Sequence, residues 1–197
     1  PILSLANAFS KEDVRAWYER ILKLNRRVAE SGFVLEPKID GLTVVLHYEN
    51  GLFILGATRG DGEIGEDITK NIRTIRAVPL KIPVGDNNPS VPEYLVVRAE
   101  AFINIADFKE LNRLLEECGE KTYQNPRNTA AGSLRQLDPN LVAQRPLTIL
   151  AYSVVGDNPR DTQWETLIYL KELGFPVSSA VQECGSIEEV LESLTEW

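Results

Sequence analysis

Residues 36–58 read EPKIDGLTVVLHYENGLFILGAT and contain two β-strand patterns around a turn. Residues 42–48 and 52–58 are rich in β-branched and aliphatic side chains, which favours strands. Asn50-Gly51 lies between them and is a strong hairpin signal, because both residues tolerate the positive φ angles of a tight turn. The sequence therefore predicts an antiparallel hairpin that is entered through the EPKIDG segment.

Outward from this hairpin, the spacing of apolar residues alternates between helical and strand periods. We expect helices over residues 11–30, 66–76, 105–118, 162–173 and 186–196, a short helix between 128 and 138, and strands over 94–103 and 147–155. In the strand over 94–103, period two places Arg98 and Glu100 on one face, opposite Val97, Ala99 and Ala101. Hairpins with separate helices predict an α+β fold of antiparallel β-sheets flanked by helices.

The composition narrows the class of protein. The chain has 197 residues, which suits one domain or one domain with a small satellite. It carries 21 Lys and Arg against 29 Asp and Glu, a net charge of −8, so a uniformly basic nucleic-acid clamp is excluded and any such contact needs a local cationic patch. No apolar run approaches the ~18–20 residues of a membrane span, so we expect no membrane insertion and a cytoplasmic location. The chain begins at Pro1 and contains no Met, and we expect it to be a piece of a longer protein.

Metal-ligating residues are sparse. Cys118 and Cys184 are far apart and form no C-x-x-C pair, and His47 is the single histidine. This arrangement predicts no zinc site and no other metal site built from these side chains.

The EPKIDG segment holds the strongest candidate for chemistry. Glu36, Lys38 and Asp40 share one face if the segment is a strand, and Gly41 leaves room for a ligand to approach the backbone. A lysine between carboxylates is also common on an exposed edge strand. As a nucleophile, Lys38 must be neutral, and removing its proton near pH 7.5 costs about 4 kcal/mol. Nearby carboxylates oppose that step, so Asp40 and Glu100 suit ribose hydroxyls or a divalent cation better.

Two further segments carry candidate basic residues: the glycine-rich loop that contains Arg59, and the segment that contains Arg127 and Arg135. Gly60, Gly62 and Gly65 match G-x-G-x-x-G, but a hairpin and three acidic neighbours do not fit a dinucleotide site, so we interpret the loop as a turn that holds Arg59 near Lys38. Arg127 and Arg135 project about 80° apart on an ideal helix, which would allow contact with consecutive phosphates in a minor basic patch. Solvated arginines and small-residue packing are the alternative interpretations.

Taken in order, these segments resemble the bacterial NAD-dependent DNA ligases. The matching blocks are SL and NAF (residues 4–9), EPKIDG (36–41), TRGDG and GEDIT (58–69), VRAEAF (97–102), and NPRN and AGSLRQLD (125–138). K-x-D-G alone would be a weak signal. Five ordered blocks are a specific one, and the similarity runs through the remaining chain.

The resemblance implies an adenylation (nucleotidyltransferase) domain over residues 1–197, incomplete on its C-terminal side, with the ATP-grasp-type fold of DNA ligases and mRNA capping enzymes. In that family the lysine of K-x-D-G attacks the α-phosphate of NAD and carries AMP, which passes to the 5′-phosphate of nicked DNA before the strand is sealed in replication and repair. Carried over by position, Lys38 would be the nucleophile. The cofactor-binding positions would be Ser4, Leu5, Glu36, Asp40, Gly41, Arg59 and Glu100, and the phosphate or DNA-end contacts would be Arg127 and Arg135.

The resemblance also implies partners and limits. NAD, magnesium or manganese, and nicked double-stranded DNA are expected, with a monomer near the bacterial nucleoid and no zinc in this stretch. The family's helical N-terminal subdomain would precede Pro1 and further motifs would follow Trp197, so we expect the isolated chain not to ligate DNA. Ala99 replaces a usual glycine, and we expect its methyl group beside the nucleotide. The alternatives are an ATP-dependent covalent nucleotidyltransferase and a noncatalytic nucleotide- or DNA-binding domain of this fold.

Overall fold

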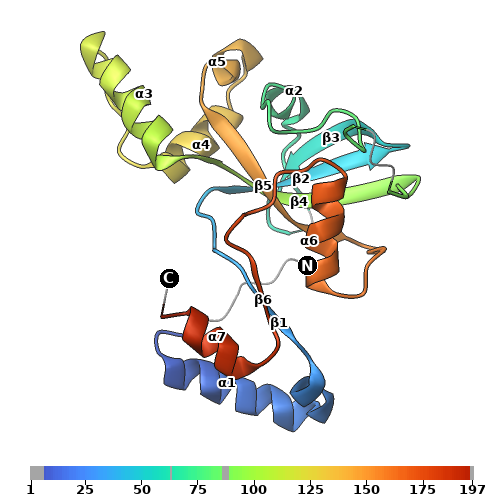
Figure 1. Ribbon diagram of the computed structural model, residues 1–197. Helices are drawn as coiled ribbons and strands as arrows, with labels where there is room; N and C mark the ends of the chain where they lie inside the picture. Colours follow the sequence, from blue (N-terminus) through green and yellow to red (C-terminus); the bar gives the residue numbers. More distant parts are fainter. Residues whose placement is uncertain (1–6, 63, 86–88, 196–197) are drawn as a thin grey trace. The chain divides into compact units, whose positions relative to one another are not determined.

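A computed structural model describes residues 7–62, 64–85 and 89–195 of the chain (Figure 1). Two compact units can be distinguished. The larger comprises Lys38–Ser178, and the smaller combines Ile2–Pro37 with Ser179–Trp197.

The larger unit is built on a four-stranded antiparallel sheet with the order β3-β2-β4-β5. Its elements are β2 (Leu42–Glu49), β3 (Leu52–Thr58), α2 (Thr69–Ile72), β4 (Tyr94–Ile103), α3 (Ile105–Glu117), α4 (Pro126–Leu134), α5 (Pro139–Ala143), β5 (Leu147–Val155) and α6 (Gln163–Glu172). The predicted hairpin is confirmed: Asn50 has φ 49° and Gly51 has φ 76° at its tip. Antiparallel strands with separate helices confirm the α+β class.

The two faces of this sheet differ in polarity. In β4 the residues alternate between buried and half-buried, so that Val97, Ala99 and Ala101 are fully buried while Arg98 and Glu100 are half-buried. The buried face packs against α2, α4 and α6 in one apolar cluster. The predicted partition of β4 is therefore confirmed, and the opposite face carries the polar side chains.

Ala99 lies on the core side of β4, which differs from the prediction for its side chain. Ala99 is 0% exposed and pairs with Val44 and Ala151 on the core side of the sheet. Its methyl group lies in the core and not on the polar face of the sheet, where the expectation of a methyl group beside the nucleotide had placed it. Alternation along β4 is the reason, because Ala99 and Glu100 must point to opposite faces.

The helix predicted over residues 66–76 is much shorter. Only Thr69–Ile72 is α-helical, and the residues before it run along β3 instead. Asp67 forms a bridge with Ala57, and the Ile68 N–H donates to the Gly56 carbonyl at 2.8 Å. Pairing with the strand takes up backbone groups that a longer helix would need.

The short helix predicted between residues 128 and 138 ends earlier, at Leu134, and a separate helix, α5, begins at Pro139. Asn125 caps α4 by accepting a hydrogen bond from the Asn128 N–H, and Asp138 caps α5 in the same way through the Asn140 N–H. Arg135 is the C-cap residue of α4 and lies just beyond its last helical residue, and the angle of about 80° expected between Arg127 and Arg135 stays a prediction.

The smaller unit contains α1 (Lys11–Leu24), the 3-10 helix η1 (Arg26–Glu30), β1 (Phe33–Leu35), β6 (Gln182–Cys184) and α7 (Ile187–Ser193). The helix predicted over 11–30 breaks at Asn25, whose backbone is extended and whose side chain accepts from the Arg27 N–H. β1 and β6 pair antiparallel, with Phe33 opposite Cys184. Across the described parts of both units, every helix is too short or too polar to cross a lipid bilayer.

Candidate active site

Lys38 lies in an irregular segment that leads directly into β2. Residues 36–40 form no strand, so the prediction that Glu36, Lys38 and Asp40 share a strand face was wrong. Gly41 explains why the segment lies so close to β4. A Cβ on Gly41 would lie 2.2 Å from the Ala101 carbonyl oxygen, so any larger residue would push the two strands apart. The side chain of Lys38 is exposed at this end of the sheet.

Glu100 is anchored beside this segment by two hydrogen bonds. It lies opposite Thr43 in the β2–β4 register. Its Oε1 accepts from the Gly41 N–H at 3.2 Å, and its Oε2 accepts from the Thr43 hydroxyl at 2.9 Å. Burial raises the pKa of Glu100, while these hydrogen bonds and the charges of Arg127 and Lys38 act to lower it. Glu100 and Lys38 therefore lie within electrostatic reach of each other, as predicted.

Arg127 connects α4 to the same segment. Its Nη1 lies 2.7 Å from Asp40 Oδ1, across 87 residues of sequence. Both side chains are more than half exposed, so this ion pair contributes little to stability. Its effect is local: it holds a guanidinium group at the first turn of α4, close to Lys38 and Glu100.

Arg59, Tyr152 and Arg98 complete the polar face. Tyr152 and Arg98 were not among the predicted site residues. The Arg59 N–H donates to the Thr43 carbonyl at 3.3 Å at the end of β3. Burial raises the pKa of Tyr152, hydrogen bonding with the Thr43 side chain acts to lower it, the charge of Glu100 acts to raise it, and the charges of Arg98 and Arg59 act to lower it. The side chains close to one another on this face are therefore those of Thr43, Arg59, Arg98, Glu100 and Tyr152.

A bulge explains why Tyr152 could not be located from strand alternation. The β4–β5 register shifts between Arg98 and Ala99, so β5 contains an extra residue at Tyr152. Arg98 could have been selected, because it shares a strand face with Glu100. Among the described side chains, Arg98 Nε is a buried nitrogen without a hydrogen-bond partner.

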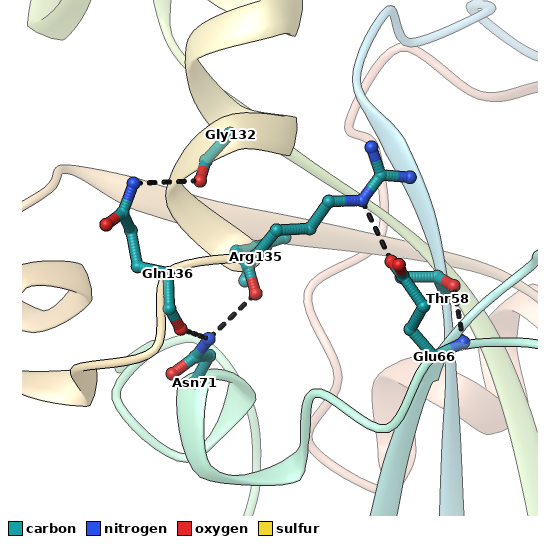
Figure 2. Close-up of polar contacts among 7 residues, drawn as sticks. Thr58, Glu66, Asn71, Gly132, Arg135 and Gln136 are labelled. Atoms are coloured by element: carbon teal, nitrogen blue, oxygen red, sulfur yellow. Dashed lines mark hydrogen bonds and ion pairs between the residues drawn. The ribbon is translucent and has the colours of Figure 1, made fainter.

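Four predicted site positions are not among the described side chains of this group. Arg135 contacts Glu66, with Nε 2.9 Å from Oε2, at the other end of α4 (Figure 2). Glu36 belongs to the smaller unit, and its role stays a prediction. Ser4 and Leu5 lie outside the described residues, so their roles stay predictions as well.

The raised pKa of Glu100 leads to a test by stability. Between the ordinary carboxyl value of 4.5 and the raised folded value, the folded protein holds more of this proton than the unfolded chain. The contribution of Glu100 to the free energy of unfolding therefore falls as pH rises through this window. Glu100→Gln keeps an oxygen acceptor without the charge. We expect the stability of Glu100→Gln relative to the wild type to increase from about pH 4 to pH 7 in urea unfolding.

A matched control has the opposite sign. Hydrogen bonding to Arg113 lowers the pKa of Glu110 on α3. Glu110→Gln should therefore lose stability relative to the wild type over the same rise in pH. A Glu100→Gln difference that follows the Glu110→Gln trend would contradict the placement of Glu100 in a desolvated position.

Comparisons with known proteins identify the family of this chain. The family model for the NAD-dependent DNA ligase adenylation domain matches residues 1–197. The whole chain aligns with a DNA ligase of Roseiflexus castenholzii at 50% identity over 206 residues, and with a DNA ligase of Chloroflexus aurantiacus at 48% over 205 residues. A DNA ligase of Shouchella clausii is 47% identical over 201 residues. The chain spans 28–29% of the length of these three relatives. It belongs to the NAD-dependent DNA ligase adenylation domain family.

Proposed function

We propose that residues 1–197 form the adenylation (nucleotidyltransferase) domain of an NAD-dependent DNA ligase and that Lys38 takes AMP from NAD. The observation that carries the proposal is the grouping of an exposed lysine amine with Glu100 and with the Asp40–Arg127 pair, in a chain of this family. A nucleophile needs access to its substrate, and the exposed position of Lys38 provides it.

The proposed chemistry has three steps. The neutral Nζ of Lys38 attacks the α-phosphorus of NAD and forms a P–N bond, the amine loses a proton, and the bond to nicotinamide mononucleotide breaks with its electron pair on the leaving phosphate. An oxygen of a DNA 5′-phosphate then attacks the same phosphorus, and the lysine amine leaves and regains a proton. Finally the 3′-hydroxyl attacks the activated 5′-phosphate, which releases AMP and seals the strand.

The surrounding side chains suit a nucleotide with a negatively charged phosphate. Each Glu100 oxygen accepts one hydrogen bond and has a second lone pair available for a ribose hydroxyl. Arg59, Arg98 and Arg127 supply cationic donors, and an anion would also satisfy the buried Nε of Arg98. Tyr152 adds an aromatic surface to this face. Ser4, Leu5 and Glu36 are proposed for the adenine side, as the resemblance implies.

A divalent cation is proposed only as an ion bound to the substrate. The described residues gather no group of three or more His, Cys, Asp or Glu side chains able to hold a metal ion. Asp40 is paired with Arg127, and Glu100 already accepts from Gly41 and Thr43. This donor set does not fit a metal held by the protein alone, so magnesium or manganese is proposed to arrive on the phosphates of NAD.

The remaining partners follow from the proposed reaction. The substrate of the second and third steps is nicked double-stranded DNA, as encountered in replication and repair. We propose a monomer that acts in the cytoplasm at the nucleoid, where NAD and DNA are both present. Arg127 and Arg135 are the proposed contacts to the phosphate of the nucleotide or of the DNA end.

The experiment that tests the function compares two nucleotides. The full-length protein is incubated with magnesium and either NAD or ATP, each radiolabelled in its α-phosphate. We expect covalent label from NAD only, and mass spectrometry should locate AMP on the peptide that contains Lys38. Label from ATP alone would favour an ATP-dependent nucleotidyltransferase, and binding of either nucleotide without label would favour a noncatalytic domain.

A further inference from the structure

The glycine loop after β3 presses Glu66 against the end of that strand. Gly60 has φ 56°, and a Cβ there would lie 1.6 Å from the Ile64 carbonyl oxygen. A Cβ on Gly65 would lie 1.9 Å from the Thr58 carbonyl oxygen. Only glycine fits such close approaches, so the loop folds back tightly. In the candidate site around Lys38 and Glu100, this loop has no role beyond placing Arg59.

Two backbone contacts then fix Glu66 to Thr58. The Thr58 N–H donates to the Glu66 carbonyl at 3.0 Å. The Glu66 N–H donates to the Thr58 hydroxyl at 2.9 Å, as drawn in Figure 2. Thr58 is 4% exposed, so Glu66 is attached to a buried part of the sheet. Its carboxylate is held at a defined point even though the side chain itself is exposed.

The carboxylate of Glu66 contacts one edge of the Arg135 guanidinium. Oε2 accepts from Nε at 2.9 Å, and Figure 2 shows the two terminal nitrogens of Arg135 pointing away from Glu66. An exposed pair of this kind adds little stability. It does restrict the rotamers of a long side chain and leaves two parallel donors for an oxyanion, which suits bidentate contact with a phosphate.

Asn71 fixes the backbone on both sides of Arg135. Its side chain is buried, and Nδ2 donates to the carbonyls of Leu134 and Gln136, each at 2.8 Å. These carbonyls lie at the C-terminal end of α4, where helix carbonyls lack partners within the helix. Both hydrogens of the amide are therefore used on the residues that flank Arg135, as Figure 2 shows for the whole arrangement.

We propose that Glu66 and Asn71 are positioning residues for Arg135. Asn71 sets the path of the backbone at the end of α4, and Glu66 turns the guanidinium so that its terminal nitrogens meet a phosphoryl oxygen. The inference rests on the proposed function, because that function supplies the phosphoryl group. In this arrangement the glycine loop has the role of bringing Glu66 to Arg135.

A double-mutant cycle in the full-length ligase tests this inference. The variants are Glu66→Ala, Arg135→Ala and the combination. Two rates are measured: transfer of AMP from NAD without DNA, and sealing of a nick that already carries AMP. We expect Glu66→Ala to lower at least one rate about tenfold, Arg135→Ala to lower the same rate further, and the combination to match Arg135→Ala. The affected rate tells whether the phosphate belongs to NAD or to the DNA end.

Conservative variants separate positioning from a general structural role. Glu66→Gln keeps an oxygen acceptor for Nε and should retain most of the rate, whereas Arg135→Lys lacks the planar fork and should not. In the Arg135→Lys background, Glu66→Ala should have no further effect. Asn71→Ala should lower the same rate as Glu66→Ala, and it should cause no further loss when it is combined with Arg135→Ala. Thermal melting verifies that the Asn71→Ala variant is folded. Glu110→Ala, which breaks a comparable exposed pair with Arg113, should keep both rates.

The outcomes are distinguishable. A wild-type protein that takes no AMP from NAD would refute the proposed function. Three outcomes would overturn only the positioning of Arg135, provided that the wild type is labelled normally. They are unchanged rates in Glu66→Ala, unchanged rates in Arg135→Ala, and losses that add in the combined variant.

Discussion

A Lys38→Arg variant of the full-length protein is expected to take up no detectable AMP from NAD, and Lys38→Ala is expected to behave the same way. The arginine keeps the positive charge near Glu100 but remains protonated at any accessible pH, so it has no lone pair with which to attack phosphorus. Loss of the nucleophile should lower the rate of covalent labelling by a factor on the order of 10⁴ or more. The measurement is retention of label from NAD under denaturing conditions.

The controls for this result address binding and nonspecific labelling. Lys109→Arg changes an exposed lysine on α3 and should label as the wild type does. Calorimetric titration of Lys38→Ala with NAD should still show binding, because Glu100, Arg59 and Arg98 remain in place. Label that persists in Lys38→Arg would assign the nucleophile to another residue. Loss of NAD binding in Lys38→Ala would make Lys38 a binding group.

The parts of the fold that could be predicted are those with strong local patterns. The hairpin of β2 and β3 follows from two β-rich segments around Asn50-Gly51, and the faces of β4 follow from alternation. The strands β1 and β6 could not be predicted, because three residues give too short a pattern and their pairing joins Phe33 to Cys184 across most of the chain.

Polar capping and strand pairing account for the helices whose limits differ. Asn25 and Asp138 offer their side chains to nearby backbone N–H groups, which ends or restarts a helix where the apolar period alone continues. The segment before α2 pairs with β3, and this tertiary contact overrides its helical spacing.

The candidate site was predictable where resemblance and geometry agree. Lys38, Asp40, Gly41, Glu100 and Arg127, which the resemblance names, lie in one neighbourhood in which Asp40 is engaged with Arg127, and their roles in the reaction stay predictions. The bulge that places Tyr152 near Glu100 depends on the pairing of β4 with β5, so no local pattern could indicate it. The Glu66–Arg135 contact likewise spans 69 residues and depends on how the glycine loop folds back.

Gly41→Ala is expected to reduce transfer of AMP from NAD about 100-fold, even though no reacting group is removed. The new Cβ would lie 2.2 Å from the Ala101 carbonyl oxygen and 2.9 Å from the Phe102 Cβ. These atoms belong to β4 or lie next to its backbone, so the start of β2 must move away. That shift breaks the 3.2 Å hydrogen bond from the Gly41 N–H to Glu100 and displaces Lys38. A misplacement of about 1 Å is enough for a loss of this size.

Gly132→Ala separates this steric effect from a general effect of losing glycine. A Cβ on Gly132 meets no atom within 4 Å, and the residue lies inside α4. Alanine there should raise the free energy of unfolding by about 0.5–1 kcal/mol, because it restricts the unfolded chain and favours the helix. Gly41→Ala should instead lower it by about 1–3 kcal/mol through overpacking. Urea unfolding and the labelling rate measured on both variants give the answer: if Gly41→Ala labels at the wild-type rate, the close approach of β2 to β4 does not set the position of Lys38.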